Sequence, residues 1–163
     1  MTRKSSPRRR VILFLWITLA NFSVAQSTFE LAADSLSALL PALEGVERID
    51  ARVELARALH HVDPERGLEI ANEGLEEARK IGYSRGYVDL LVASGYTLSH
   101  LGKMGESLER LLEAVTRAKR NYYLEGEADA YNYIAITFYF LGNNNNALKY
   151  HLQSLQIREE IKD

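Results

Sequence analysis

The chain has 163 residues, of which 47% are hydrophobic and 26% charged, as expected for one soluble folding unit. Lys and Arg total 20 against 22 for Asp and Glu, so the chain lacks the excess positive charge that nucleic-acid binding requires. The sequence contains no cysteine, which excludes disulfide bonds, thiol nucleophiles, zinc sites with cysteine ligands and lipid attachment at cysteine. The fold must therefore be held together by packing.

Residues 1–25 differ in kind from the rest of the chain. Three arginines, Arg8 to Arg10, precede an uncharged apolar run over residues 11–25, which closes on small residues at Ser23 and Ala25. This order is typical of a secretory signal peptide, and the run is shorter than the roughly 20 residues that span a bilayer. We therefore expect a signal peptide cleaved after Ala25 and a secreted or periplasmic protein. A retained membrane anchor is the alternative.

Residues 26–45 are expected to form a linker and a short capping helix. Leu36, Leu39, Leu40 and Leu43 fall on one side of an amphipathic helix over residues 34–43. Pro41 should kink this helix, and Gly45 should end it. Such a helix would cover the N-terminal end of the domain that follows.

A period of 40 residues organises the chain from residue 46 onward. A small residue followed by leucine recurs at Gly67, Ser107 and Ala147, and Leu101-Gly102 matches Leu141-Gly142 at the same spacing. We predict three units, residues 46–86, 87–126 and 127–163, each made of two helices. An ordinary helical bundle with accidental likeness is the alternative, but the fixed period over three units argues against it.

The third unit shows how each helix pair is encoded. Its first helix, predicted over residues 128–141, has an apolar face at helical spacing, and Gly142 ends it. Its second helix is predicted over residues 146–161. The first unit departs from the pattern, because its turn is one residue shorter and carries the helix-start pair Asp63-Pro64. Terminal repeats are commonly atypical.

Small and large residues alternate in the second and third units at fixed positions. These are Leu91, Ser94, Gly95, Leu98, Gly102, Ser107, Leu111 and Ala114, and then Tyr131, Ile134, Ala135, Phe138, Gly142, Ala147 and Ser154. The pattern resembles the tetratricopeptide repeat (TPR) family, whose standard unit has about 34 residues. Each unit here is longer, with the extra residues placed after the second helix at 81–86 and 121–126. The resemblance implies an all-α, right-handed α-α superhelical solenoid of antiparallel helix pairs.

A second resemblance concerns the setting of these repeats. Three short segments, Leu39 to Pro41, Glu47 to Asp50 and Asp63 to Glu65, are similar to the start of bacterial extracytoplasmic sensor proteins. The resemblance implies a sensing or docking part of a larger signalling protein, with a histidine kinase, a diguanylate cyclase or a regulator as its output.

The last predicted helix leaves an apolar stripe without cover. Leu148, Leu152, Leu155 and Ile161 share this stripe, which in a stacked array is roofed by the next unit. We expect the repeats to continue beyond residue 163. The alternative is a stand-alone exported scaffold that associates with itself through this end.

No set of residues in the sequence forms a catalytic constellation. There is no glycine-rich phosphate-binding loop, and we expect no enzyme activity, no cofactor and no bound metal. His61 and His100 occupy equivalent helix ends, so a zinc or copper site completed by a carboxylate is a competing hypothesis. We favour solvated or helix-capping imidazoles, because positive charge is favourable at helix C-termini.

The TPR resemblance implies that the first helix of each unit lines a concave groove that binds a protein or peptide. Exposed positions of those helices should form a strip with polar and aromatic members, which suits an extended peptide rather than nucleic acid. The predicted strip is Arg57, His61, Val92, Tyr96, His100, Asp129, Asn132, Ile136, Tyr139 and Phe140, flanked by Asp50, Val53, His60, Asp89 and Ser99. Alternatively, some of the aromatic residues, Phe140 above all, pack against neighbouring helices. Membrane contact is expected only through an uncleaved signal or a downstream segment.

Overall fold

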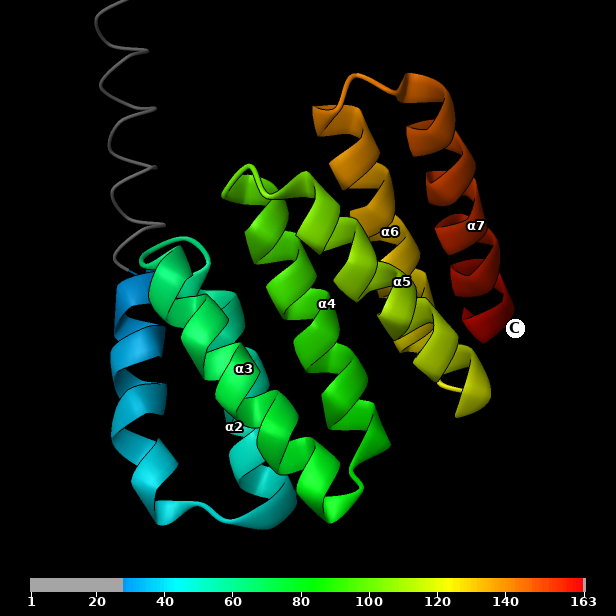
Figure 1. Ribbon diagram of the computed structural model, residues 1–163. Helices are drawn as coiled ribbons and strands as arrows, with labels where there is room; N and C mark the ends of the chain where they lie inside the picture. The colour runs from blue at the N-terminus through cyan, green and yellow to red at the C-terminus, as the bar shows by residue number, and fades with distance from the viewer. Residues whose placement is uncertain (1–27, 163) are drawn as a thin grey trace, which may run out of the picture.

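The computed structural model describes residues 28–162, a range that is helical apart from short turns and contains no strand (Figure 1). Six long helices follow a helical segment at residues 28–39 and a short 3-10 helix. Their bounds are η1 Leu40–Ala42, α2 Gly45–Leu59, α3 Pro64–Ile81, α4 Ser84–His100, α5 Met104–Arg120, α6 Leu124–Phe140 and α7 Asn144–Lys162. The predicted signal peptide at residues 1–25 lies outside the described residues. No helix within residues 28–162 is both long and apolar enough to cross a membrane.

The helices stack as antiparallel pairs in two layers (Figure 1). The pairs are α2 with α3, α4 with α5, and α6 with α7, and each pair packs on the next. The first helices α2, α4 and α6 also contact one another in sequence, whereas the second helices α3, α5 and α7 do not. Closer spacing in one layer than in the other curves the stack, with the first helices on the inside. The prediction of an all-α, TPR-like solenoid is confirmed.

The recurring small residues allow the helices of a pair to approach closely. A Cβ atom added at Gly95 of α4 would lie 2.6 Å from Cγ of Leu111 on α5. The close approach also allows a hydrogen bond between the helices of a pair: Ser154 Oγ on α7 donates to the carbonyl oxygen of Ala128 on α6 at 2.7 Å. Leu111, Ala114 and Ala128 are completely buried. Interiors pack at crystal-like density, so these positions tolerate little change in volume.

The helix boundaries differ from the predicted ones in several places. The capping helix, predicted over residues 34–43, is a helical segment at residues 28–39 followed by η1. Gly45, expected to end the capping helix, is instead the first residue of α2 and has a φ of 58°. The extra residues of each unit were expected in the connections, but they lengthen the helices. Only residues 82–83 separate α3 from α4, and α6 starts at Leu124, four residues before its predicted start. Asp63 and Pro64 start α3 as predicted, and the Asp63 carboxylate accepts a hydrogen bond from the backbone N–H of Arg66 at 3.0 Å.

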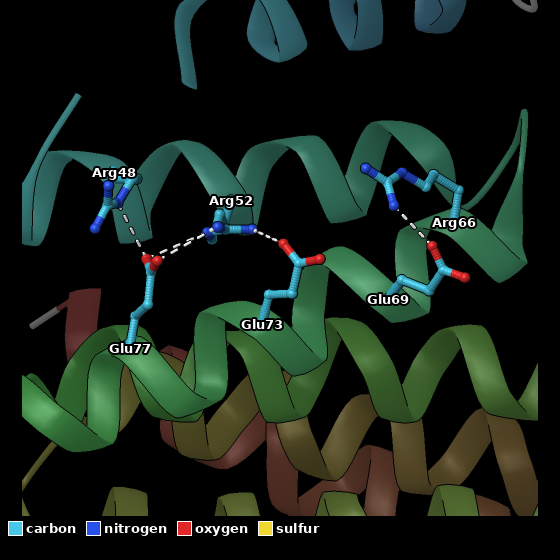
Figure 2. Close-up of polar contacts among 6 residues, drawn as sticks. All are labelled: Arg48, Arg52, Arg66, Glu69, Glu73 and Glu77. Carbon is cyan, nitrogen blue, oxygen red and sulfur yellow. Dashed lines mark hydrogen bonds and ion pairs between the residues drawn. The ribbon is translucent and has the colours of Figure 1, made fainter. Parts of the chain in front are cut away.

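Ion pairs tie α2 to α3 on the flank of the first helix pair (Figure 2). Arg52 reaches Glu73 at 2.6 Å and Glu77 at 3.3 Å, and Arg48 reaches Glu77 at 3.2 Å. The stem of Arg52 passes over Gly74, because its Cδ would lie 3.2 Å from a Cβ added there. The glycine therefore makes room for the arginine that holds both glutamates.

Candidate functional site: the concave face of α2, α4 and α6

The predicted strip residues all lie on the inner layer, but they are not equally accessible. Arg57, His61 and His100 are exposed, as are Tyr139 at 64% and Phe140 at 45%. The half-buried members are Tyr96, Asp129, Asn132 and Ile136. Val92 is only 2% exposed, so its assignment to the groove surface was wrong. Among the flanking positions, Val53, His60 and Ser99 are also buried. The first helices pack against one another, and this contact covers these positions.

A column of rings runs across the three first helices. The ring of His60, the residue directly after α2, stacks on that of Tyr96 on α4, with centroids 4.0 Å apart and planes inclined by 21°. Tyr96 in turn lies 4.4 Å from Tyr133 on α6, at 34°. Flat side chains stacked in this way bury a large apolar area at little cost in conformational entropy. The column joins all three helix pairs along the concave side.

A second row of rings lies beside this column. Phe29, from the helical segment 28–39, stacks on His61 at 4.4 Å. His100 meets the ring of Phe140 edge to face at 5.3 Å, and Tyr139 lies 6.2 Å from Phe140. We call these eight residues the ring strip: Phe29, His60, His61, Tyr96, His100, Tyr133, Tyr139 and Phe140. Phe140 thus has both predicted roles, since it contacts a neighbouring helix and remains 45% exposed.

Three imidazoles meet in the middle of the ring strip. His60 lies 4.7 Å from His61 and 4.5 Å from His100, both measured between ring centroids. Its Nδ1 lies 3.3 Å from Oγ1 of Thr97, whose own hydroxyl donates to the carbonyl of Ala93 at 3.0 Å. The single hydroxyl proton is therefore used, so His60 Nδ1–H is the donor to Thr97.

The surroundings of His60 and His100 favour the neutral forms of these two imidazoles. Burial lowers the pKa of His60 to about 4, and the nearby His100 and His61 act in the same direction. Burial also lowers the pKa of His100, with a smaller contribution from His61. His60 is therefore uncharged at neutral pH, which suits a ring stacked between aromatic neighbours.

The competing hypothesis of a zinc or copper site finds no support here. Residues 28–162 contain no group of three or more His, Cys, Asp or Glu side chains that could hold a metal ion. His100 does approach the first unit, but its contact is the ring of His60. The three imidazoles do lie together, but within residues 28–162 no carboxylate completes a metal-binding group with them.

Aspartates near the other end of the first helices are engaged in internal contacts. Tyr123 donates its phenolic O–H to Asp89 Oδ1 at 2.9 Å, and Arg158 of α7 pairs with Asp129 at 2.6 Å. Burial raises the pKa of Asp89, although the hydrogen bond from Tyr123 opposes this shift. Burial likewise raises the pKa of Tyr123 to about 12. Asp129, a predicted ligand contact, therefore already has a partner within the chain.

Sequence reasoning missed two ring-strip members. Tyr133 was overlooked because the second unit has Ala93 at the equivalent position, so no repeated signal marked it. Phe29 lies ahead of the repeats, and nothing in the period could place it. One signal in the sequence could have indicated Tyr133: it is a large aromatic residue at the position where the preceding unit has the small Ala93.

The face opposite the concave side carries a separate acidic cleft of about 490 Å³ between α3 and α5. Its lining is Asn72, Leu75, Glu76, Tyr87, Leu91, Glu106, Glu109, Arg110 and Glu113. None of the predicted strip residues contributes to this cleft.

Comparison with known families agrees with this architecture. Among curated proteins, no match to the chain is found. A family model described as tetratricopeptide repeat matches residues 87–160, the segment from the start of α4 to near the end of α7. This match covers the second and third helix pairs, and the first pair, α2 with α3, continues the same stacking.

Proposed function

We propose that the protein is a non-catalytic binding module that captures a protein or peptide on the concave face of α2, α4 and α6. Tetratricopeptide repeats are protein-protein interaction modules and are generally not enzymes. The observation that carries the proposal is the exposed end of the ring strip, where Tyr139 is 64% and Phe140 is 45% exposed. Large exposed aromatic side chains are the residues that most often anchor binding partners.

The groups around this end fit an extended segment of a partner chain. Ile136 and Asn132 lie on α6 with the exposed rings and are half-buried. An amide side chain both donates and accepts hydrogen bonds, so Asn132 matches the needs of a peptide backbone. Exposed His61 and His100 continue the surface toward α2 and α4. Apolar anchoring at α6 with polar contacts along the strip is the mode of recognition we propose.

A selected peptide offers a direct test of this surface. A random peptide library is screened against the full chain, and the affinity of the best peptide is measured for Tyr139→Ala and Asn132→Ala. Loss of an anchoring aromatic side chain commonly costs 2 kcal/mol or more, so we expect binding to Tyr139→Ala to weaken about thirtyfold. Lys149→Ala, an exposed change on α7, is the matched control and should bind normally. Unchanged affinity in both concave-face variants would remove this surface from consideration.

The cellular setting belongs to the same proposal. We place the module outside the cytoplasm, as the sensing or docking part of a larger bacterial signalling protein. The support is the signal-like order of residues 1–25 and the similarity to extracytoplasmic sensor proteins. Mass spectrometry of the protein recovered from the periplasmic fraction tests export. A chain starting at Gln26 is expected, and a chain confined to the cytoplasm contradicts the proposal.

Self-association through α7 is a second candidate function. Its exposed face carries Leu148 at 61%, Leu152 at 55% and Leu155 at 50%. The residues equivalent to Leu155 in the preceding units, Leu75 and Val115, are only 9% and 7% exposed, because α4 and α6 pack beside them. Light scattering of the full chain over a range of concentrations tests this candidate. A dimer that Leu152→Glu dissociates is expected, whereas a monomer at every concentration excludes it.

A further inference from the structure

The junction between the first two helix pairs depends on rings that can acquire charge. Three of the four histidines of the chain, His60, His61 and His100, meet there in direct ring contact. His60 is central, because it touches the other two imidazoles, stacks on Tyr96 at 4.0 Å and bonds Thr97. Histidine is also the side chain whose ordinary pKa lies within the range of mild acidification. The contact between the end of α2 and the end of α4 is thus made largely by rings that can be protonated.

No carboxylate within residues 28–162 contacts any of the three rings. On α2, Arg57 is three residues before His60 and pairs with Glu54 at 2.9 Å. In the turn to α3, the Asp63 carboxylate is occupied by the backbone N–H of Arg66 at 3.0 Å.

The neighbouring elements likewise offer the imidazoles no negative charge. Their contacts are Tyr96 from α4, Phe140 from α6 and Phe29 from the segment at 28–39. Tyr133 of α6 touches Tyr96. Lys103, three residues after His100, adds another positive charge at the end of α4. A positive charge on the imidazoles would therefore go unpaired.

Protonation works against this arrangement in two ways. A charge on His60 would sit in a partly desolvated column of rings, and a charge on His100 as well would place two cations 4.5 Å apart. Burial and the neighbouring imidazoles already lower the pKa of His60 to about 4 in the closed arrangement. A structure in which α2 has moved away from α4 hydrates these rings and binds protons more readily, so acid favours it.

We propose that mild acid opens the concave face between the first and second helix pairs by charging the imidazoles that join α2 to α4. Partner capture on this face then weakens as the pH falls. This regulatory role rests on the proposed binding function, whereas the opening itself does not.

The second junction supplies an internal comparison. Between α4 and α6 the ring contacts are Tyr96 with Tyr133 and His100 with Phe140, so only one imidazole takes part. Acid that charges His100 alone creates no pair of cations at that junction. The same fall in pH should leave α4 and α6 in contact.

Equivalent surface positions allow both junctions to be measured in the full chain. Glu69, Glu109 and Lys149 are exposed on α3, α5 and α7, each 40 residues from the next, and the sequence has no natural cysteine. Spin labels on Glu69→Cys with Glu109→Cys report the first junction, and labels on Glu109→Cys with Lys149→Cys report the second. Distance distributions are recorded by pulsed electron paramagnetic resonance at about pH 7.5 and about pH 4.5, the range over which histidines titrate. Circular dichroism verifies that the helices persist at both values.

We expect the mean distance of the first pair to shift by roughly 2 Å or more, as in helix movements at bistable interfaces, and that of the second pair to stay constant. Adding His60→Phe and His100→Phe, which keep rings but remove the charge, should abolish the shift. The proposal is overturned by a first pair that does not respond, by a shift that persists in the double variant, or by equal shifts of both pairs.

Binding of the selected peptide separates this inference from the proposed function. If the distance shift occurs and Tyr139→Ala leaves peptide affinity at neutral pH unchanged, the opening stands and the concave binding surface fails. If Tyr139→Ala weakens binding and no shift occurs, the binding function stands and the acid response fails.

Discussion

Tyr123, at the start of the third helix pair, donates its phenolic O–H to Asp89 of α4 at 2.9 Å and so links two neighbouring pairs. Arg85 lies 4.5 Å from the centroid of the same ring. The bond satisfies a carboxylate that burial would otherwise penalise, as the raised pKa of Asp89 shows.

Removing this bond should destabilise the junction between α4 and α6. Hydrogen bonds to charged groups contribute about 1.5–3 kcal/mol, so Tyr123→Phe should lower the free energy of unfolding by about 1.5 kcal/mol or more. Urea denaturation followed by circular dichroism measures this change. Tyr122→Phe is a matched control at the adjacent position, where the side chain is 92% exposed, and it should cost less than about 0.5 kcal/mol. Equal effects of the two changes would show that the bond to Asp89 does not stabilise the fold.

Glycines on neighbouring elements should respond in opposite directions to an added methyl group. At Gly95 the new Cβ would lie 2.6 Å from Cγ and 2.8 Å from Cδ2 of Leu111, which is completely buried. Overpacking of this kind costs about 1–3 kcal/mol, so Gly95→Ala should lower the thermal midpoint. Gly105 lies within α5 with nothing within 4 Å of the added atom, so Gly105→Ala should stabilise by about 0.5–1 kcal/mol. If the thermal midpoint falls in both variants, the assignment of open space beside Gly105 is wrong. If it rises in both, the assignment of close packing at Gly95 is wrong.

Stability should depend on pH through His60. Its pKa is about 4 in the folded chain and 6.5 in the reference state, so between these values the unfolded chain binds more protons. The contribution of His60 to stability is therefore complete above pH 6.5 and is lost as the pH falls toward 4, by at most about 3 kcal/mol. His60→Phe keeps a flat ring without the charge. We expect its urea midpoint to fall less between about pH 7 and pH 4.5 than that of the wild type. Parallel pH profiles of the two proteins would rule out His60 as the responsible group.

The ion pairs of the first helix pair should contribute to the free energy of unfolding only where they are sheltered from solvent (Figure 2). The side chain of Arg52 is 13% exposed and pairs with both Glu73 and Glu77. Arg66 and Glu69, which pair with each other within α3, are 52% and 64% exposed. Arg52→Met should cost about 1–2 kcal/mol, because Glu77 loses one of its two arginines in a partly buried place. Arg66→Met should cost less than about 0.5 kcal/mol. Similar urea midpoints for the two variants would indicate that shelter from solvent does not strengthen these pairs.

Part of the fold can be predicted from the sequence alone. The period of 40 residues predicted stacked helix pairs, because each small position such as Gly95 recurs where two helices must approach. Asp63 and Pro64 predicted the start of α3 for a local reason, since a side-chain cap and a fixed φ act within one turn of helix. Local rules could not give the length of the connections. The residues assigned to loops continue the helices, and positive-φ Gly82 leaves only residues 82–83 between α3 and α4.

The concave site was predicted less completely, because its members depend on contacts between helices far apart in the chain. Helical spacing correctly placed Tyr139 and Phe140 on an exposed surface of α6. It failed for Val92, which neighbouring helices cover, and it could not show that Asp129 already pairs with Arg158. Periodicity reports which face of a helix is apolar, but not how closely the next helix approaches.

The sequence determined the class of fold, since repeated small, aliphatic and turn residues admit one way of stacking. Tertiary structure alone decided which rings meet. His60, Tyr96 and Tyr133 are separated by 36 and 37 residues, and only the closeness of α2, α4 and α6 stacks them into one column. The same closeness buries His60 beside two other imidazoles and lowers its pKa to about 4. Charge and accessibility on the concave face are thus properties of neighbouring helices, which no single helix encodes.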